Sequence, residues 1–257
     1  MAASRQPAVF IGHGSPMNTL EDNAWTRAWR GFGARVPRPR AVLCVSAHWY
    51  IGGAAVTAMP APRTIHDFGG FPQALFEVQY PASGAPSLAA EVAGLLAPIE
   101  VQADMSWGLD HGTWSILAHV FPSADVPVVQ LAIDRTRPDS YHLEVGRLLA
   151  PLRDDGVLVM GSGNTVHNLG LADFGATEPF DFTVRFDEHV QRALDGRDDD
   201  ALVAYRDHPD GLLAAPTPEH YLPLLYVAGA RHDDDELTVL TDGYAAGSLS
   251  MRSVVLA

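Results

Sequence analysis

Five of the eleven histidines in this 257-residue chain have small or turn-forming neighbours, a setting in which a side chain can face a ligand. They are His13, His48, His111, His167 and His220. Neutral imidazole is the commonest metal ligand in proteins and also the side chain best suited to proton transfer near pH 7. If the fold gathers these residues, the simplest chemistry is a metal site with a catalytic histidine beside it.

Three of these histidines come after apolar runs that are typical of buried parallel strands. His13 follows the run 7–11, His48 follows 41–46, and His167 follows 156–160 and a Gly-Ser-Gly segment that we interpret as a turn. Ligands in open α/β sheets bind at the carboxyl ends of the strands. We therefore expect these imidazoles to project from one edge of one sheet.

Each position also has a simpler structural interpretation. His13, between two glycines, fits a tight turn with a solvated ring, and His48 fits a core histidine bonded to a carbonyl group. The segment Gly161-Ser162-Gly163 lacks the GxGxxG spacing and the Walker lysine of phosphate-binding loops. A single histidine therefore decides little, whereas two at adjacent strand ends are typical of metal-dependent enzymes.

Two acidic residues stand directly beside candidate histidines. Asp110 precedes His111 and could orient a neighbouring imidazole or cap a helix that starts near Thr113. Glu219 precedes His220 at an expected helix start, where adjacent side chains point about 100° apart. Only one of that pair should therefore bind a metal.

Short β-rich apolar runs alternate along the chain with segments of helical periodicity, which indicates an αβα sandwich with a mostly parallel central sheet. We expect strands at 7–11, 41–46, 126–133, 156–160, 237–240 and 248–256, with 54–58 as a further candidate. We expect helices at 21–32, 87–96 with Ser87 as N-cap, 113–120, 139–152, 182–194 and 221–228. The last two strands should pair antiparallel at one edge. No linker or repeat divides the chain, so we expect 1–257 to be one domain.

The segment 59–85 is rich in proline and glycine and carries four aromatic residues. Loops of this length are often functional lids. We expect it to fold over the sheet edge and to bring His66 or Phe71 into a ligand pocket. Trp114, near the start of the expected helix 113–120, is a candidate for the pocket wall, together with Phe68.

Composition excludes several classes of protein. A hydrophobic content of 47% with 19% charged residues fits a soluble globular protein, and the formal charge of −14 opposes nucleic-acid binding. No segment approaches the roughly 20 apolar residues of a membrane span, and the N-terminus lacks a signal-type apolar stretch. The single cysteine, Cys44, lies in an apolar run, excludes an internal disulfide and fits a reducing cytoplasm, where we expect the protein to be. An oligomer is compatible with the sequence, which does not fix the oligomeric state.

The remaining motifs and histidines carry less chemistry. The chain has no CxxC, HExxH or GxSxG, which removes thiolate zinc sites, zincin proteases and the usual serine-hydrolase elbow. Five further histidines lie in helical or acidic contexts, where we expect solvated or locally hydrogen-bonded rings: His119, His142, His189, His208 and His232.

Taken in order, six short motifs resemble the LigB-type class III extradiol ring-cleavage dioxygenases, in particular the branch that is similar to DOPA 4,5-dioxygenase. The motifs are Gly12-His13-Gly14-Ser15-Pro16, Ser46-Ala47-His48-Trp49, His66-Asp67-Phe68-Gly69-Gly70-Phe71-Pro72, Leu109-Asp110-His111-Gly112-Thr113-Trp114, Gly161-Ser162-Gly163-Asn164 with His167-Asn168-Leu169, and Glu219-His220-Tyr221-Leu222-Pro223. They extend from position 12 to position 223, so the resemblance covers nearly the whole chain. Each motif alone is weak, but six in sequence are specific.

The resemblance implies a fold, a metal site and an activity. It implies a mononuclear non-haem iron(II), a catechol-type substrate and O₂, with His13 and His48 as metal ligands and His167 as the acid/base histidine. His220 stands where the wider class has a glutamate, and Glu219 is the neighbour that would restore that triad. An all-histidine set also suits zinc, for which His167 would be a fourth ligand.

The reaction implied is insertion of O₂ next to the diol to give a muconic semialdehyde. His167 would take a proton from the bound catechol, and His111 or the protonated His167 would return one. Phe68, Phe71 and Trp114 would form walls against the flat ring. Two alternatives stay open: a zinc-dependent hydrolase with His167 or Glu219 as base, and a non-catalytic binding or signalling module on the same fold.

Overall fold

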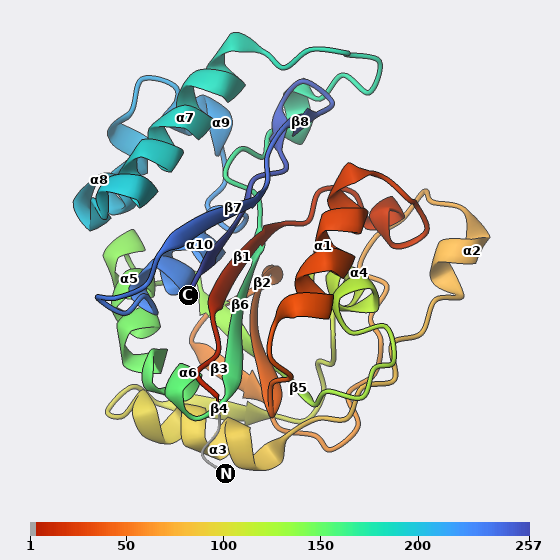
Figure 1. Ribbon diagram of the computed structural model, residues 1–257, viewed down its shortest axis with the longest axis vertical. Helices are drawn as coiled ribbons and strands as arrows, with labels where there is room; N and C mark the ends of the chain where they lie inside the picture. The colour runs from red at the N-terminus through yellow and green to blue at the C-terminus, as the bar shows by residue number, and fades with distance from the viewer. Residues whose placement is uncertain (1–3) are drawn as a thin grey trace.

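A computed structural model describes residues 4–257 as an eight-stranded sheet with helices packed on both faces (Figure 1). The strand order is β4 (Val101–Asp104), β3 (Ala54–Thr57), β5 (Val128–Asp134), β2 (Ala41–Ile51), β6 (Val157–Gly163), β1 (Ala8–Gly12), β10 (Ser253–Leu256) and β7 (Leu237–Thr241). The four middle strands, from β5 to β1, all run parallel. The expected αβα sandwich with a mostly parallel sheet is therefore confirmed.

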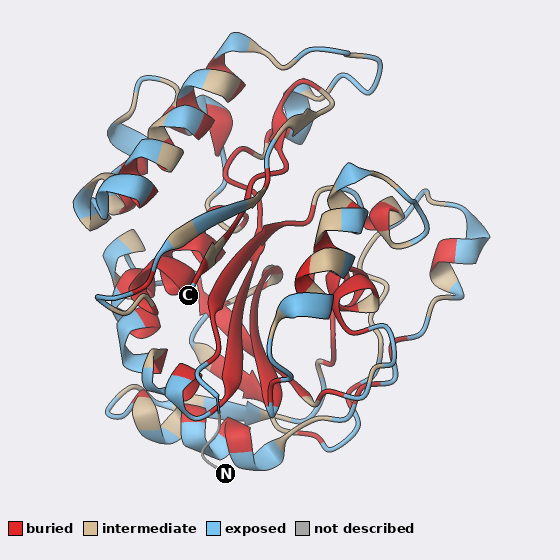
Figure 2. Ribbon diagram, in the orientation of Figure 1, coloured by how far each residue is buried: buried red, intermediate tan, exposed pale blue. Residues whose placement is uncertain are grey.

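The middle strands are apolar along most of their length because both of their faces are covered. Val9 and Ile11 of β1 pack against α1 (Ala24–Arg35) and α4 (His111–Val120). Ala8 and Phe10 alternate with them along the strand, so they belong to the core on the opposite face. That second core includes α3 (Pro86–Leu95), α5 (Asp139–Leu149) and α10 (Leu222–Gly229). Figure 2 shows the buried sheet between these two layers.

Antiparallel strand pairs flank the parallel centre of the sheet on both sides. β10 pairs antiparallel with both β1 and β7, as expected for the last two strands. At the other edge β3 meets β5 antiparallel, and β4 pairs parallel with β3. β4 was not predicted, because its four residues are mixed in polarity and none is fully buried. A separate two-stranded ribbon consists of β8 (Tyr244–Ala245) and β9 (Leu249–Ser250).

One further long helix, α7 (Asp181–Gly196), lies beside the β8–β9 ribbon (Figure 1). The remaining helices are short: α2 (Gln73–Phe76), α6 (Pro151–Asp154), α8 (Asp199–Val203), α9 (Gly211–Ala214), and the 3₁₀ turns η1 (Pro16–Thr19), η2 (Leu169–Leu171) and η3 (Tyr205–Asp207). Segments this short carry no detectable periodicity, so they were not expected. None of the helices within residues 4–257 is long and apolar enough to cross a membrane.

The predicted N-cap of α3 is wrong. Ser87 lies inside the helix, and the capping position is Ala85, whose side chain makes no capping hydrogen bond. Pro86 occupies the first helical position, where its missing N–H would have had no partner in any case. At α1, by contrast, Asn23 and Thr26 form a reciprocal capping box, so the helix starts three residues later than predicted.

Two strands extend further than expected, and both changes affect the candidate site. β2 runs on to Ile51 through a register shift between Val45 and Tyr50, so His48 lies within the strand. β6 includes Gly161, Ser162 and Gly163, so this segment is strand and not a turn. The glycines allow the strand to touch the turn before α10, because a Cβ on Gly163 would lie 2.0 Å from the carbonyl oxygen of His220.

A buried ion pair joins several elements at the amino ends of β1 and β6. Arg153 and Asp235 both have fully buried side chains, with Nη1 of Arg153 2.5 Å from Oδ2 of Asp235. The same guanidinium also donates to the carbonyl groups of Gln6, Ala230 and Leu256. One side chain therefore fixes the starts of the central strands, the C-terminal strand and the end of α10.

Two of the histidines expected to be solvated or locally hydrogen-bonded lie in the core, each with a partner distant in sequence. His119 is 8% exposed and hydrogen-bonds the carbonyl oxygen of Asn18, and His142 is fully buried beside the hydroxyl of Tyr226. His119 lies on α4, where nearly every residue is buried, and His142 lies on the buried face of α5. The residues next to them in sequence did not indicate this burial. Cys44 is buried as expected, and burial raises the pKa of its thiol.

Candidate metal centre

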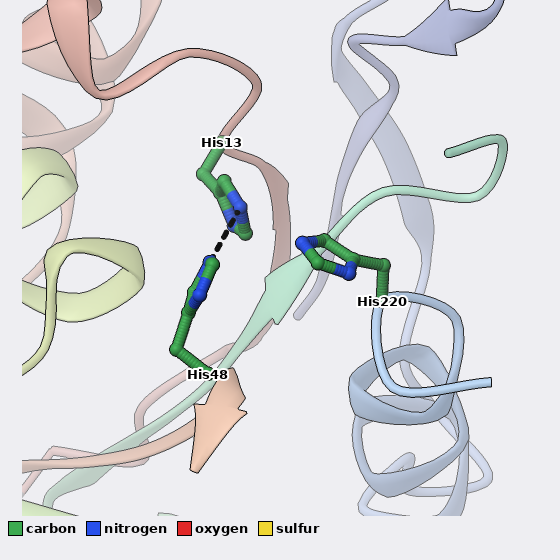
Figure 3. A group of neighbouring side chains, drawn as sticks. All are labelled: His13, His48 and His220. Atoms are coloured by element: carbon green, nitrogen blue, oxygen red, sulfur yellow. Dashed lines mark hydrogen bonds between the residues drawn. The ribbon is translucent and has the colours of Figure 1, made fainter. Parts of the chain in front are cut away.

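Three imidazoles from three different elements meet at the carboxyl edge of the sheet. His13 follows β1, His48 lies near the end of β2, and His220 lies in the turn before α10. One ring nitrogen from each residue falls within a group whose members all lie within 4.8 Å of one another. Figure 3 shows the three rings pointing toward one another, with Nε2 of His13 3.2 Å from Nε2 of His48.

The outer nitrogen of His13 faces a hydroxyl group. Its Nδ1 lies 2.9 Å from Oγ of Ser162, and that hydroxyl donates its own proton to the carbonyl oxygen of Gly112 at 2.5 Å. Ser162 therefore accepts a hydrogen bond from Nδ1–H of His13, and the lone pair of this imidazole lies on Nε2.

The other two rings have carboxylates behind them. Nδ1 of His48 lies 3.2 Å from Oδ2 of Asp67, and Nδ1 of His220 lies 3.2 Å from Oε1 of Glu219. A carboxylate oxygen facing Nδ1 favours the tautomer that carries the proton on Nδ1 and the lone pair on Nε2. This pattern of an outward N–H on an acceptor is how metal-ligating histidines are oriented.

These residues fit a metal ion. Two unprotonated nitrogens 3.2 Å apart repel each other unless a cation lies between their lone pairs. Two ligands, each about 2.0–2.1 Å from one Zn²⁺, would lie roughly 3.0–3.4 Å apart, which matches the separation of His13 and His48. The arrangement of the three imidazoles therefore fits a divalent metal ion.

Burial keeps these rings neutral. It lowers the pKa of His13 and of His220 well below the ordinary value, and it lowers the pKa of His48 to about 3. Positive charge on the neighbouring histidines would lower each pKa further in the same direction. At neutral pH the lone pairs are therefore available to a metal.

Glu219 lies behind the group formed by His13, His48 and His220 and does not belong to it. Its Oε1 accepts a hydrogen bond from Oγ1 of Thr217 at 2.7 Å and faces Nδ1 of His220. The residue also belongs to a second group with His167 and His220, but it does not line the adjoining cavity. Of this adjacent pair, the structure turns His220 inward.

Asp67 from the long loop contacts two histidines at once. Its Oδ2 lies 3.0 Å from Nδ1 of His111 as well as 3.2 Å from His48, and its Oδ1 accepts the backbone N–H of His111 at 2.9 Å. Burial alone would raise the pKa of Asp67, but the contacts with His111 and His48 outweigh it and the pKa is lowered. The carboxylate is therefore ionised and holds both rings.

Asp110 caps α4 and orients no imidazole. Its Oδ1 accepts hydrogen bonds from the backbone N–H of Thr113 and from the hydroxyl of Ser46. Burial raises the pKa of Asp110 to about 6. Of the two interpretations open for this residue, the structure bears out the helix cap.

His167 stacks on His220. The ring centroids are 3.5 Å apart and the planes differ by 6°, while the backbone N–H of His167 donates to the carbonyl of Ala214. Neither of its ring nitrogens hydrogen-bonds another residue in the described part of the chain, and the ring lines the cavity. Burial lowers its pKa to about 4, so at neutral pH it can accept a proton.

The histidines open into a cavity of about 260 Å³. Its other walls are apolar or small, and this is close to the lower size limit of ligand pockets, enough for a single-ring molecule. The lining residues are His13, Gly14, Ser15, Pro16, His48, Phe68, Phe71, His111, His167, Leu169, Phe174, His220 and Leu249.

Residues 7–256 match a family model described as the catalytic LigB subunit of aromatic ring-opening dioxygenase. This chain belongs to the LigB family. It is 51% identical over 259 residues to 4,5-DOPA dioxygenase extradiol from Escherichia coli strain K12, covering 99% of this chain and 96% of that one. It is 33% identical over 252 residues to the protein of the same name from Beta vulgaris, covering 95% and 94%. We conclude that it is an enzyme of the extradiol ring-cleaving class.

The LigB fold is also seen in a related solved structure. The crystal structure of an uncharacterized Escherichia coli K12 protein matches with a TM-score of 0.88 at 45% identity, covering 98% of this chain and 100% of that one. The histidine site therefore lies in a fold shared over the full length of both proteins.

In this LigB protein only some of the residues predicted to line the cavity from the long loop 59–85 do so. Phe68 and Phe71 line the cavity, but His66 does not: its Nε2 lies 3.0 Å from the carbonyl oxygen of Val78. Trp114 is fully buried, and its indole N–H donates to the carbonyl of Ile65. Both rings pack against Phe68 and do not line the cavity, so contact of His66 and Trp114 with substrate stays a prediction.

Sequence reasoning assigned no role to several residues that shape this site. Asp67 and Ser162 stand behind the histidines, and Leu169, Phe174 and Leu249 complete the cavity wall. Asp67, Ser162 and Leu169 stand within the family-like motifs beside the candidate histidines, and this position was the available signal. Phe174 and Leu249 lie outside those motifs, and nothing in their sequence context indicated a place in the cavity wall.

Proposed function

We propose that this enzyme binds a catechol through its two hydroxyl groups at the site formed by His13, His48 and His220, and cleaves the ring next to the diol with O₂. The product is a muconic semialdehyde. Both atoms of O₂ are retained in it, so the reaction needs no external reductant. We take residues 1–257 as one catalytic domain, in keeping with the family model over 7–256.

The observation that carries the proposal is the convergence of three neutral Nε2 atoms on an apolar, single-ring cavity. His13, His48 and His220 would hold the metal ion, and the cavity beside them would admit the two catechol hydroxyls and dioxygen. Bound iron(II) would supply the redox chemistry that joins O₂ to the ring. The all-histidine set also suits Zn²⁺, which would bind in the same place without redox activity.

His167 acts as the general base. It is neutral at pH 7, its ring nitrogens have no hydrogen-bond partner among residues 4–257, and it lies against His220 at the cavity wall. It takes the proton of a catechol hydroxyl and holds it for return to the product. Its membership of the group with Glu219, and not of the group with His13 and His48, favours a base over a fourth metal ligand.

His111 is the second catalytic histidine of this proposal. Its Nδ1 lies 3.0 Å from Oδ2 of Asp67, so its Nε2 is the ring nitrogen available to the substrate. Phe68 and Phe71 close one side of the cavity and exclude water from the ring. His111 therefore orients an oxygen of the substrate while His167 moves the proton.

The test is anaerobic loading of the metal-free protein with iron(II), followed by addition of catechol and O₂. The expected result is consumption of one O₂ per catechol and a yellow semialdehyde absorbance. Zinc-loaded protein is the matched control and should bind the ring without turnover. Hydrolysis of an ester or amide panel by the zinc form, with no O₂ uptake by the iron form, would support the hydrolase alternative instead.

A further inference from the structure

His167 is held in place by its backbone and not by hydrogen bonds to its ring. Within residues 4–257 neither of its ring nitrogens makes a hydrogen bond, whereas the ring of each histidine at the metal site faces an oxygen acceptor. The stack on His220 sets the plane of the ring but not its position within that plane. Because a general base must lie within reach of the proton that it takes, the segment that carries His167 has to set this position.

That segment, 164–168, lies between the β8–β9 ribbon and the end of α9. On the ribbon side the backbone N–H of Ser250 donates to the carbonyl oxygen of Val166 at 3.0 Å. On the other side the backbone N–H of His167 donates to the carbonyl oxygen of Ala214 at 2.8 Å. The position of the His167 ring therefore depends on where the ribbon lies relative to this segment.

One buried carboxylate, that of Asp187 on α7, joins the segment to the ribbon. Its Oδ1 accepts hydrogen bonds from the hydroxyl groups of Thr165 and Ser250, both at 2.7 Å. Its Oδ2 accepts hydrogen bonds from Nε and Nη2 of Arg252, at 3.0 and 2.6 Å, and from the hydroxyl of Tyr244 at 3.3 Å. The side chain of Asp187 is fully buried where α7 lies beside the ribbon (Figure 1). Donors from the His167 segment and from the C-terminal part of the chain therefore meet on one carboxylate.

We propose that Asp187 is a positioning residue for the general base. Through the hydroxyl of Thr165 it fixes the backbone that carries His167, and through Ser250 it fixes the ribbon beside that backbone. Asp187 itself lines neither the cavity nor the metal site, so it acts only through these contacts. The inference rests on the role of His167 in catechol cleavage proposed above.

The test cuts the link at Thr165, because removing Asp187 itself would leave the largely buried Arg252 without its carboxylate and would destabilise the fold. Misplacing a catalytic group by about 1 Å can lower turnover by about 10²-fold. In iron-loaded Thr165→Val we expect kcat for catechol to fall by roughly tenfold, with KM and metal affinity within about twofold of wild type. Thr165→Ser restores the hydroxyl and should restore kcat.

Thr183→Val is the matched control. Thr183 is a fully buried threonine of α7 whose hydroxyl donates to the carbonyl oxygen of Gly247 at 2.8 Å and does not contact Asp187. Each of the two valine substitutions removes one buried hydroxyl and leaves its acceptor with another donor, which for Gly247 is the backbone N–H of Phe180. The control should therefore keep kcat within about twofold of wild type.

A double-mutant cycle with His167→Phe distinguishes positioning of the base from general loosening of the fold. If Thr165 acts through His167, adding Thr165→Val to His167→Phe should change the residual turnover by less than about twofold. The same tenfold loss in both backgrounds, or an equal loss in Thr183→Val, would overturn the positioning role of Asp187.

A spectroscopic readout on the zinc-loaded protein needs no turnover. The ring C–H signal of His167, assigned by its absence from the NMR spectrum of His167→Phe, reports the stack on His220. Thr165→Val should shift or broaden this signal, whereas Thr165→Ser and Thr183→Val should leave it near its wild-type position. If wild type cleaves no catechol, the proposed function fails and this signal alone decides the placement of His167. An unchanged signal in Thr165→Val would overturn the positioning role, whether or not the iron-loaded enzyme turns over.

Discussion

Nε2 of His13 lies 3.2 Å from Nε2 of His48, and both rings turn their Nδ1 toward oxygen acceptors. The acceptors differ: a serine hydroxyl whose proton is used elsewhere, and a carboxylate shared with His111. Each fixes the tautomer that leaves a lone pair inward. The protein therefore holds two lone pairs face to face, an arrangement that a bound cation stabilises.

Replacing His167 distinguishes a general base from a fourth metal ligand. In His167→Phe the phenyl ring can keep the stack on His220, so the iron-loaded variant should bind metal with unchanged affinity. Turnover of catechol should fall by about 10²–10⁴-fold, the usual contribution of general acid–base catalysis. Metal titration and steady-state kinetics on the same preparation provide the check. A large loss of metal affinity would make His167 a fourth ligand.

Asp67 should matter for metal affinity although it does not face the cavity. In Asp67→Asn the side chain keeps its size but loses the charge that holds Nδ1 of His48 and of His111. Loss of such a supporting carboxylate lowers metal affinity by about 10–100-fold. Competition with a chromophoric chelator measures the change. Asp125→Asn, on the surface beside Arg38, is the control and should bind metal as wild type does.

Acid should destabilise the fold partly through His142. Burial lowers the pKa of His142 to about 4, whereas the unfolded chain has the ordinary value near 6.5. Between these values the unfolded chain binds a proton that the folded protein rejects, so the free energy of unfolding falls as pH falls through this window. The loss by pH 4.5 should be about 2–3 kcal/mol, and His142→Gln should lack it. Urea unfolding of wild type and of His142→Gln at pH 7.5 and 4.5 measures the loss in each protein. Equal losses in the two proteins would exclude His142 as a cause.

Removing one member of the buried ion pair should be costly. Asp235→Ala leaves the Arg153 guanidinium buried without its carboxylate, which should lower the free energy of unfolding by about 3–5 kcal/mol. Asp234→Ala removes the adjacent aspartate, whose side chain is 70% exposed and pairs with Arg5. This control substitution should lower the free energy of unfolding by less than about 1 kcal/mol. Similar losses in the two variants would contradict the importance of burial.

The sequence was most informative where strand pattern and strand direction determine position. Apolar runs before His13 and His48 predicted a common edge, because parallel strands end together. Loop residues could not be placed in this way. His66 and Trp114 turn away from the cavity while Phe71 faces it, and this choice depends on the path of 59–85, which no periodicity records.

Local chemistry that serves two purposes was also ambiguous. From the sequence, Asp110 could be either a helix N-cap or the partner of a histidine. In the structure it is the N-cap, and Asp67 from a distant loop contacts His111. Gly161 and Gly163 suggested a turn because glycine favours turns. They serve instead to let β6 approach the backbone of 220–223, a contact between segments almost sixty residues apart.

Equilibrium metal titration of wild type, His220→Ala and Glu219→Gln tests the three-histidine site most directly. Wild type should bind one divalent ion per chain. His220→Ala should lose at least about 100-fold in affinity, whereas Glu219→Gln, whose amide oxygen can still accept from Nδ1 of His220, should stay within about tenfold. Full metal occupancy in His220→Ala, with affinity lost in Glu219→Gln, would contradict the assignment and make Glu219 the third ligand.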